Sequence, residues 1–410
     1  MEAITHLRQG LELLETLPET PQRLQREVDL LIAMGASLLA VQGYAAAEVR
    51  ETYTYAQQLC QHLEDPYQLF PVLRGLCSYH IVRAELRTAH ALGEQLLILA
   101  QQVHDTAMLC AAHRALGTTL FDLGTAAEAL THYTQGLALY DFQQHRASAL
   151  LYGEDTGVLC HSFAALALWC LGYPEQGLTQ SQQAVTLARQ IAHPFSLAFA
   201  LSFAAVFHML RREEHCAQEC VEASMRLARE QGFPLWIGSG ECLHGWTLVQ
   251  QGQAQEGIKQ ITQGLTAYRA TGAAIRRPQF LALLAEAHGA IGQPETGLTM
   301  LTEALTLVDA TGERWYEPEL YWLKGVLLSR QSADNQAEAE DCFHHALAIS
   351  RGKQAKSFEL RAATSLAQLW QQQGKRQEAQ DLLAPVYNWF TEGFDTVDLK
   401  DAKALLDALA

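Results

Sequence analysis

The chain has 410 residues, of which 49% are hydrophobic and 18% are charged. That length could supply the cores of two or three ordinary domains. Lys and Arg number 29 against 45 Asp and Glu, which gives a formal net charge of −16. This acidic balance argues against nucleic acid or an anionic membrane as a partner, because both require a basic surface. With 28 glycines and only 11 prolines, a collagen-like or proline-rich disordered chain is excluded.

The cysteines indicate the compartment. There are nine of them, scattered along the chain, and the first residues lack the basic start and apolar stretch of a secretory signal. We therefore expect a reduced, cytoplasmic setting in which cysteine acts as a small core residue. The most apolar stretch, residues 195–210, is shorter than the roughly 20 apolar residues of a membrane span. It predicts a buried helix and no membrane contact.

A repeat of about 40 residues covers most of the chain. Segments similar to residues 129–140 begin at positions 89, 129, 177, 217, 257, 297, 337 and about 378. The step is 40, except for 48 between positions 129 and 177 and 41 at the end, and the longer step indicates an insertion near residues 143–152. Self-similarity at such a fixed period is the sequence signature of solenoids and related arrays.

Small residues recur at three positions of each unit. One position lies twelve residues before the segment start, one at the start and one seven residues after it, as in Gly245, Gly257 and Gly264. Small side chains allow two helix backbones to approach closely, as the arms of a helix hairpin require. Apolar residues recur at helical spacing in both halves of the unit, and turns that contain glycine separate the halves. We predict nine pairs of helices, A followed by B, and no strand.

The spacing of these small residues resembles the tetratricopeptide repeat (TPR) family over residues 24–391. The resemblance implies an all-α fold, a right-handed α-solenoid in which the A helices line the concave face. The period of 40 departs from the 34 residues of a TPR. A HEAT-type array, whose period is about 40–47 residues, is the alternative.

The two ends of the array differ from the repeats. Residues 3–14 match a B helix with no A helix before it, so we expect an orphan half-repeat helix over residues 1–20 and a chain derived from a longer one. The solenoid then covers residues 21–392. Residues 393–410 are expected to form a C-terminal capping helix.

Residues 313–328, 366–380 and 389–396 are similar to recurrent segments of large bacterial signalling proteins. Those proteins combine an adenylate/guanylate cyclase or transcription-regulator module, a P-loop ATPase of the STAND type and a C-terminal TPR-like array. The resemblance implies a regulatory or scaffold array whose partner is a protein or peptide, with an associated ATPase or cyclase module among the candidates. The family often has a basic residue where this chain has Trp322.

No motif for catalysis or metal binding is present in the sequence. Residues 252–260, the string nearest to a phosphate loop, lack the Lys and the hydroxyl residue at the required places. His215, Cys216 and Cys220 supply too few ligands for a closed zinc site, which needs four, and helix packing explains them better. We predict a protein that is not an enzyme and needs no cofactor or metal.

The concave groove is the predicted binding site. By the resemblance, four positions of each A helix point inward, at six before, three before, one after and four after the small residue. Those with recognition chemistry are Arg74, Arg114, Trp169, Trp246, Gln279, Glu286, Glu319, Trp322 and Arg361. In protein recognition, Trp supplies contact area and Arg supplies bidentate pairing. The pattern predicts a surface that binds a protein or peptide.

Alternatives stay open for this face. The Trp side chains could fill the core between repeats, with the charged side chains in solvent. Residues 162–209 are apolar along the face and could form a pocket for a small inducer, as in the sensing array of a transcriptional or cyclase regulator. We also expect an ion pair between Glu317 and Arg277 across a repeat boundary.

Overall fold

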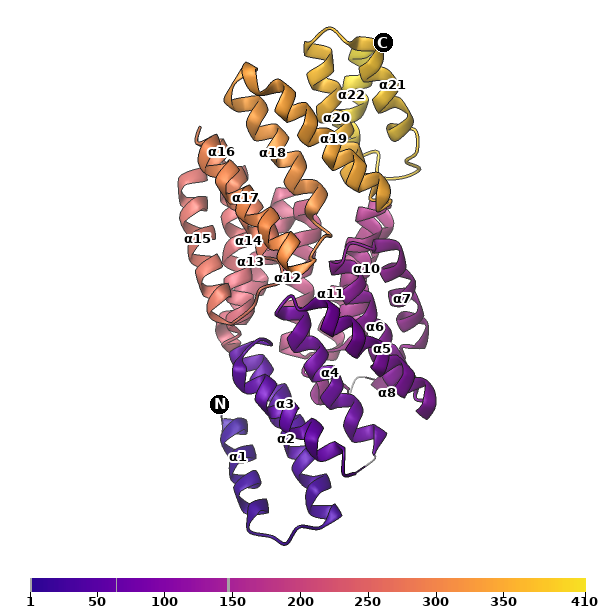
Figure 1. The fold of residues 1–410 in the computed structure, drawn as a ribbon, viewed down its shortest axis with the longest axis vertical. Helices are drawn as coiled ribbons and strands as arrows, with labels where there is room; N and C mark the ends of the chain where they lie inside the picture. Colours follow the sequence, from indigo (N-terminus) through magenta and orange to yellow (C-terminus); the bar gives the residue numbers. More distant parts are fainter. Residues whose placement is uncertain (1, 64, 146–147) are drawn as a thin grey trace.

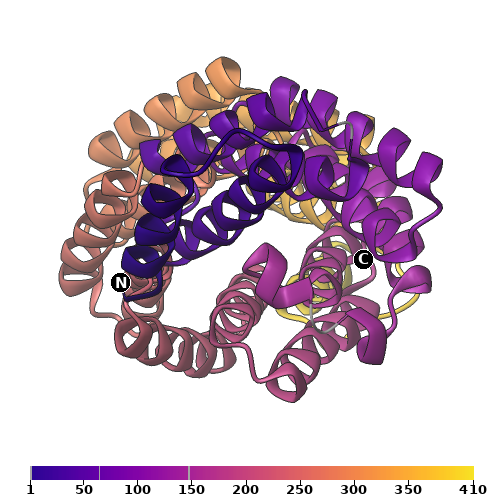
Figure 2. The same cartoon turned by 90° about the horizontal axis from the view of Figure 1, so that it is seen from below.

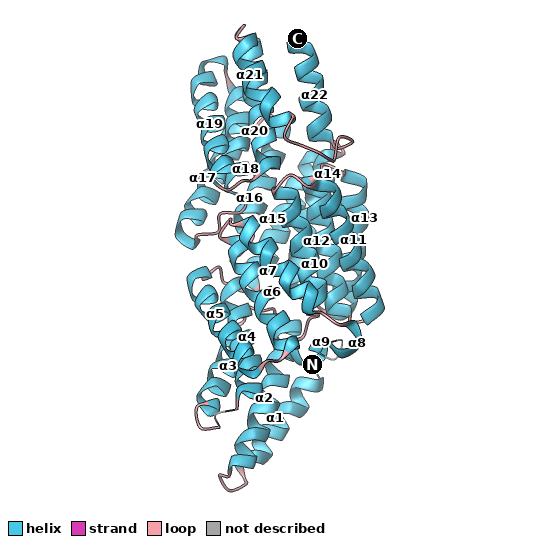
Figure 3. Ribbon diagram, turned by 90° about the vertical axis from the view of Figure 1, so that its right-hand side faces the viewer, coloured by secondary structure: helices cyan, strands magenta, loops and turns pink. Residues whose placement is uncertain are grey.

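The structure is a computed structural model that describes residues 2–63, 65–145 and 148–410. Within these ranges it contains helices and turns and no strand (Figure 3). In chain order the helices are α1 (Glu2–Glu15), α2 (Pro21–Gln42), α3 (Ala47–Cys60), α4 (Pro66–Val82), α5 (Leu86–Val103), α6 (Thr106–Asp122), α7 (Ala126–Leu139), α8 (Phe142–His145), α9 (Ser148–Tyr152), α10 (Thr156–Cys170), α11 (Pro174–Ile191), α12 (Pro194–Leu210), α13 (Glu214–Gln231), α14 (Pro234–Gln250), α15 (Ala254–Ala270), α16 (Arg277–Ala290), α17 (Pro294–Thr311), α18 (Glu317–Gln331), the 3₁₀ turn η1 (Ala333–Asn335), α19 (Gln336–Gly352), α20 (Lys356–Gln372), α21 (Arg376–Tyr387) and α22 (Val397–Leu409).

The helices form the predicted array. In the described ranges, nine consecutive A/B pairs run from α2/α3 to α20/α21, preceded by the unpaired α1 and followed by α22 (Figure 1). The α-solenoid prediction is confirmed. The expected insertion at residues 143–152 includes residues 146 and 147, which lie outside the described residues. On either side of them are the short helices α8 and α9.

The recurrent small residues lie where the two helices of a pair cross. A Cβ atom added to Gly257 would lie 2.6 Å from the carbonyl oxygen of Gly245, so the two backbones are in direct contact. A larger side chain at either position would separate α14 from α15. In the last two pairs the buried small residues are Ala339 and Ala379, and not residues 337 and 378 as the period predicts.

Local signals in the sequence define where the helices begin and end. α4 begins at Pro66, where the missing N–H costs nothing because the first turn has no intrahelical acceptor for it. The Asp65 carboxylate caps this helix by accepting the backbone N–H of Tyr67 at 2.9 Å. Gly124, between α6 and α7, has a φ of +88°, a left-handed conformation that glycine adopts without steric cost.

Seen along its long axis, the array winds into a ring of helices (Figure 2), and hydrogen bonds join its successive turns. The Arg83 side chain donates to the carbonyl of Gly272 at 3.2 Å, across 189 residues of sequence. The Ser357 hydroxyl donates to the carbonyl of Trp169 at 2.5 Å, across 188 residues. With a period of 40, one superhelical turn therefore takes between four and five helix pairs.

Backbone hydrogen bonds also join the turns. The carbonyl of Val82 accepts the N–H groups of Ala274 and Ile275 at 2.8 and 3.1 Å. The carbonyl of Asp122 accepts the N–H of Arg314 at 2.8 Å. Loops at the ends of A helices in one turn thus pair with loops that precede A helices in the next, and this contact encloses the interior of the array.

The apolar stretch at residues 195–210 is a helix inside this array. It forms α12, whose Phe195, Phe199 and Phe207 side chains are buried in the main hydrophobic core. In the described ranges, no helix combines the length and the apolar composition needed to cross a bilayer.

The expected ion pair between Glu317 and Arg277 is wrong. Glu317 pairs with Arg314 at 2.6 Å, three residues before it. The Arg277 guanidinium lies 3.8 Å from the Glu303 carboxylate of α17. The neighbouring Arg276 enters the interior instead, because its φ of +66° turns the chain at the start of α16.

We expect Gly245→Ala to lower the free energy of unfolding by about 1–3 kcal/mol, because the added methyl group overpacks the crossing of α14 and α15. Urea unfolding followed by circular dichroism measures this change. The matched control is Gly352→Ala at the end of α19, where a Cβ atom would have no neighbour within 4 Å. The control should raise stability by up to about 1 kcal/mol through helix propensity. Equal effects of the two substitutions would show that close approach is not the reason for Gly245.

Candidate functional site

Two cavities lie on the inner faces of the A helices. The first, here named the C-terminal cavity, has a volume of about 670 Å³ and is lined mainly by α14, α16, α18, α20 and α22. The second, here named the inner cavity, has a volume of about 90 Å³ and lies among α4, α6, α10, α12, α14 and α16. The C-terminal cavity has exposed side chains such as Arg330 and Gln368 at its rim, whereas the inner cavity is lined mainly by buried side chains.

Two tryptophans of the C-terminal cavity donate hydrogen bonds to polar side chains. The Trp322 indole N–H of α18 donates to the Ser365 hydroxyl at 2.9 Å. The Trp246 indole N–H of α14 donates to Glu286 at 3.2 Å, and Gln250 donates to the same carboxylate at 3.0 Å. Burial nevertheless raises the pKa of Glu286 above its ordinary value, because these two donors compensate only in part.

Arg361 of α20 is the centre of a buried charge network in this cavity. It donates to Glu319 of α18 at 2.6 Å, to Asp398 of α22 at 2.9 Å and to the carbonyl of Leu210 at the end of α12. Its guanidinium lies over the Trp169 ring, 5.0 Å from the centroid. Burial raises the pKa of Glu319 to about 7, more than the neighbouring Arg361 lowers it. The network ties the last helix to both turns of the superhelix.

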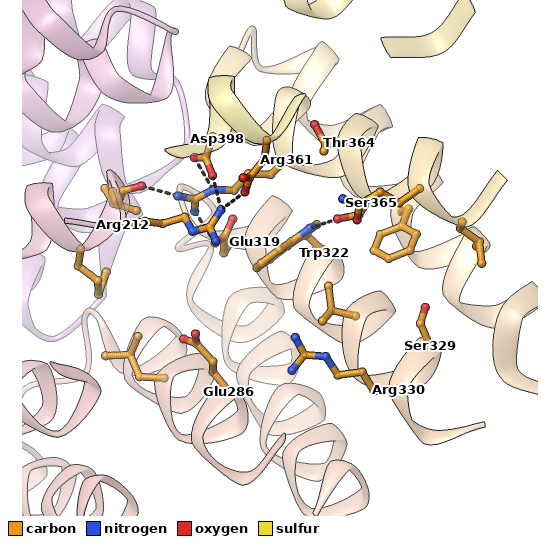
Figure 4. Close-up of a pocket in the computed structure, with 18 of the residues that line it drawn as sticks. Arg212, Glu286, Glu319, Trp322, Ser329, Arg330, Arg361, Thr364, Ser365 and Asp398 are labelled. Carbon is orange, nitrogen blue, oxygen red and sulfur yellow. Dashed lines mark hydrogen bonds and ion pairs between the residues drawn. The ribbon is translucent and has the colours of Figure 1, made fainter. Parts of the chain in front are cut away.

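Two charged groups of the C-terminal cavity have unused binding capacity. The buried Oε2 atom of Glu319 has no hydrogen-bond donor. In the described part of the chain, no carboxylate lies within 4.0 Å of the Arg330 guanidinium of α18, and Glu286 feels its charge only at longer range. Figure 4 shows Arg330, Glu286 and Trp322 projecting into the same space. The cavity therefore offers an aromatic face with a free cation and a free carboxylate oxygen near it.

The structure distributes the nine predicted groove residues over three places. The C-terminal cavity receives Trp246, Glu286, Glu319, Trp322 and Arg361. The inner cavity receives Arg114 and Gln279. Arg74 and Trp169 line neither cavity.

Arg74 is buried by residues 152–154 of its own superhelical turn, whereas Trp169 is buried where the next turn closes on it. Arg74 pairs with Glu154 at 2.6 Å and stacks on the Tyr152 ring at 4.2 Å. Trp169 packs edge-on against Phe358, which belongs to the next turn, with ring centroids 5.0 Å apart. Both residues stabilise the fold where the inward-facing pattern predicted a binding surface.

The pattern did not identify four charged residues of the C-terminal cavity, namely Arg212, Arg330, Asp398 and Asp401. Arg330 lies five residues after the small residue Gly325, one position beyond the counted inward set. Arg212 lies in the turn after α12, and Asp398 lies in the capping helix α22. Arg212 pairs with Asp398 at 3.3 Å. The two residues are 186 apart in sequence, and a repeat pattern does not predict contacts at that separation.

The cysteine and histidine groups weighed as metal ligands do not form a larger cluster. His215 lies 3.4 Å from Glu219, the exposed Cys216 lies one residue on, and Cys220 is half-buried. Among the residues that the structure describes, no three His, Cys, Asp or Glu side chains are grouped so that they could hold a metal ion.

The chain was compared with known proteins. No protein-family model matches it, and no curated protein matches its sequence. Its fold is similar to a Rap protein in complex with competence and sporulation factor, with a TM-score of 0.58 and 12% identity over 90% of this chain and 92% of that one. It is also similar to the Rap conjugation gene regulator of plasmid pLS20 with the Phr* peptide, with a TM-score of 0.51 and 12% identity over 93% and 95% of the two chains.

A third similar structure is the apo form of the quorum sensor NprR from B. thuringiensis. Its TM-score is 0.51 and its identity 13%, over 89% of this chain and 99% of that one. At such low identity these likenesses establish the fold alone. The protein is an α-solenoid of TPR-like helix pairs, wound into a superhelix whose turns touch.

The raised pKa of Glu319 predicts a dependence of stability on pH. The folded protein retains a proton on Glu319 up to about pH 7, whereas the unfolded chain releases it near the ordinary value of 4.5. Stability from this group is therefore present below about pH 4.5 and is lost as the pH rises through 7. Glu319→Gln should reduce the fall in unfolding free energy between pH 4.5 and 8 by about 1–3 kcal/mol. Chemical denaturation at several pH values measures it, and equal slopes for variant and wild type would contradict the prediction.

Proposed function

We propose that the chain is a non-catalytic regulatory module that binds a peptide in the C-terminal cavity. The observation that carries this proposal is the pair of unused charged groups beside Trp322, namely Arg330 and the Oε2 atom of Glu319. A peptide presents carbonyl or carboxylate oxygens to Arg330, N–H or ammonium groups to the carboxylates, and a side chain to the indole face. The volume of about 670 Å³ lies within the range of roughly 300–1,000 Å³ that is typical of ligand pockets.

The charges favour a ligand of mixed charge. Arg361 and Arg212 are already paired with Asp398, and Arg212 also with Asp401 at 2.7 Å. Neither Glu286 on α16 nor Arg330 on α18 has an ion-pair partner within 4.0 Å among the described residues, although the charge of Arg330 acts on Glu286 and lowers its pKa in part. We infer that the amino group of a short peptide lies near Glu286 and an acidic group near Arg330. A polyanion would meet the surrounding carboxylates and is disfavoured.

The similar solved structures support a peptide ligand. One is a complex with competence and sporulation factor, another is a complex with the Phr* peptide, and a third is a quorum sensor. The proposal extends peptide binding from those proteins to this chain. Its support within this chain is the cavity chemistry.

We also propose a signalling role for the chain. The residues 313–328 and 366–380, which resemble segments of bacterial cyclase and STAND ATPase regulators, include most of α18 and the second half of α20. These helices form one wall of the C-terminal cavity. We propose that the array is a cytoplasmic sensor or scaffold whose occupied cavity regulates a partner protein, an associated ATPase or cyclase module among the candidates.

Selection of peptides from a random display library tests the binding function. We expect wild type to enrich short peptides that combine an apolar residue with a free amino group and an acidic group. Trp322→Ala and Arg330→Ala should each weaken binding of the selected peptides by at least tenfold, about 1.4 kcal/mol, because each removes a principal contact. Fluorescence anisotropy with the labelled peptide measures the affinities.

The matched control is Arg226→Ala on α13, an exposed arginine outside both cavities. It should bind the selected peptides as wild type does. Peptides that bind wild type, Trp322→Ala and Arg330→Ala equally would place the site elsewhere. A library with no enriched sequence would contradict peptide binding itself.

A further inference from the structure

The inner cavity is separate from the proposed peptide site. It is enclosed by one complete turn of A helices, from α4 to α16. Arg114 of α6 and Gln279 of α16 face it, and so do Trp236 of α14 and Arg276. Its volume of about 90 Å³ would hold roughly six to nine water-sized groups.

Several buried donors at the inner cavity have no hydrogen-bond partner. They are Nε of Arg114, Nε2 of Gln279, Nε1 of Trp236 and Nη1 of Arg276. Arg114 Nη2 lies 3.3 Å from the Glu154 carboxylate but is not aligned for a hydrogen bond. The residues Arg114, Gln279 and Trp236 are only 3%, 1% and 6% exposed. An unsatisfied buried donor destabilises a protein by about 1–3 kcal/mol, so a group of them in one cavity indicates that acceptor atoms occupy it. Both carboxylate oxygens of Asp122, beside Arg276, and the hydroxyls of Ser78 and Thr118 are unpaired as well. The unpaired nitrogen donors of Arg114, Gln279 and Trp236 point to a ligand with oxygen acceptors at one end.

The charges around Arg114 leave one positive charge in excess. Arg74 and Arg114 share a single carboxylate, that of Glu154, at 2.6 and 3.3 Å. At the other end of the cavity Arg276 pairs with Asp122 at 2.8 Å, and its backbone N–H donates to Glu313. A monoanion beside Arg114 would balance the excess.

Asp122 and Glu313, the two carboxyl groups near Arg276, are partly protonated near neutral pH and therefore repel a bound anion less than two full charges would. Burial raises the pKa of Asp122 to about 6 and that of Glu313 to about 7, although Arg276 lowers both. Near neutral pH this end of the cavity therefore carries less negative charge than two ionised carboxylates would. Counted over the whole cavity, three arginines face three carboxyl groups, so the excess positive charge is confined to the end at Arg114.

The remaining walls are aromatic and apolar. Phe199 and Phe203 of α12 are stacked with ring centroids 4.3 Å apart, and Phe163 lies 4.7 Å from Phe203. Trp236 packs edge-on against Phe199 at 5.3 Å, with its unpaired N–H among the donors of the cavity. A ligand that satisfies the donors must therefore have an apolar body, because these rings cannot accept a second polar end.

We propose that the inner cavity binds a small monocarboxylate with a compact apolar body, and that its carboxylate pairs with Arg114. The size corresponds to an aromatic or branched-chain acid of roughly nine heavy atoms or fewer. Gln279 and the Trp236 N–H supply further donors to the oxygen end. The phenylalanines of α10 and α12 cover the apolar body.

The test uses benzoate and 4-methylpentanoate as probes, with benzamide as the neutral match of benzoate. At about 10 mM, one of the acids should raise the Tm of wild type by roughly 1–3 °C, because a ligand that binds only the folded state stabilises it. Benzamide should give no shift. Arg114→Met should abolish the shift, and it is expected to fold because Arg74 still pairs with Glu154.

Two further variants separate this site from the others. Arg330→Ala lies in the C-terminal cavity and should retain the full shift. Gln279→Leu should weaken binding of the active acid at least threefold by titration calorimetry, which serves as the test if Arg114→Met does not fold. If neither acid shifts wild type, or if benzamide acts as benzoate does, the cavity holds ordered water only and the proposal is wrong. A shift of equal size in wild type and Arg114→Met would also overturn it.

Discussion

Contact between successive turns of the superhelix is the constraint on which the interior depends. The backbone bonds from Ala274 and Ile275 to Val82, and from Arg314 to Asp122, hold loops of two turns together. Because these loops meet, the inner faces of the A helices close around a narrow interior instead of an open groove. Charged residues on those faces are consequently buried, and most of them have found partners. The buried ion pair between Asp122 of α6 and Arg276 at the start of α16 is a consequence of this closure.

The repeats were predictable because their cause is local. A helix pair requires small residues where its arms cross, and Gly245 and Gly257 show this requirement directly in the sequence. The same register predicted which A-helix positions face inward, and the structure places Glu286, Trp322 and Gln279 at cavities. Local periodicity was therefore sufficient to predict the helix pairs and many of the A-helix residues that face the interior.

What the sequence did not reveal depends on contacts between distant repeats. No pattern at a period of 40 encodes the approach of Trp169 to Phe358 or of Arg212 to Asp398. Trp169 was therefore expected in the groove although it is buried between turns, and Asp398 was not expected at the C-terminal cavity. Arg330 was missed for a smaller reason, a difference of one position in the counting of the inward face. Closure of the turns also created the inner cavity, whose lining comes from six A helices.

The separation of nearly 190 residues between paired loops has a consequence during synthesis. An array joined only by neighbouring repeats can assemble as fast as each repeat leaves the ribosome. Here the loop at Arg83 has no partner until Gly272 has been made, 189 residues later. At ordinary rates of translation this interval lasts roughly 10–40 s. During that interval the first turn is an open arc, and once α10 and α12 have been made, side chains such as Trp169 still lack the second turn that covers them. The stage at which the nascent chain is most prone to misassembly is therefore determined by the pitch of the superhelix.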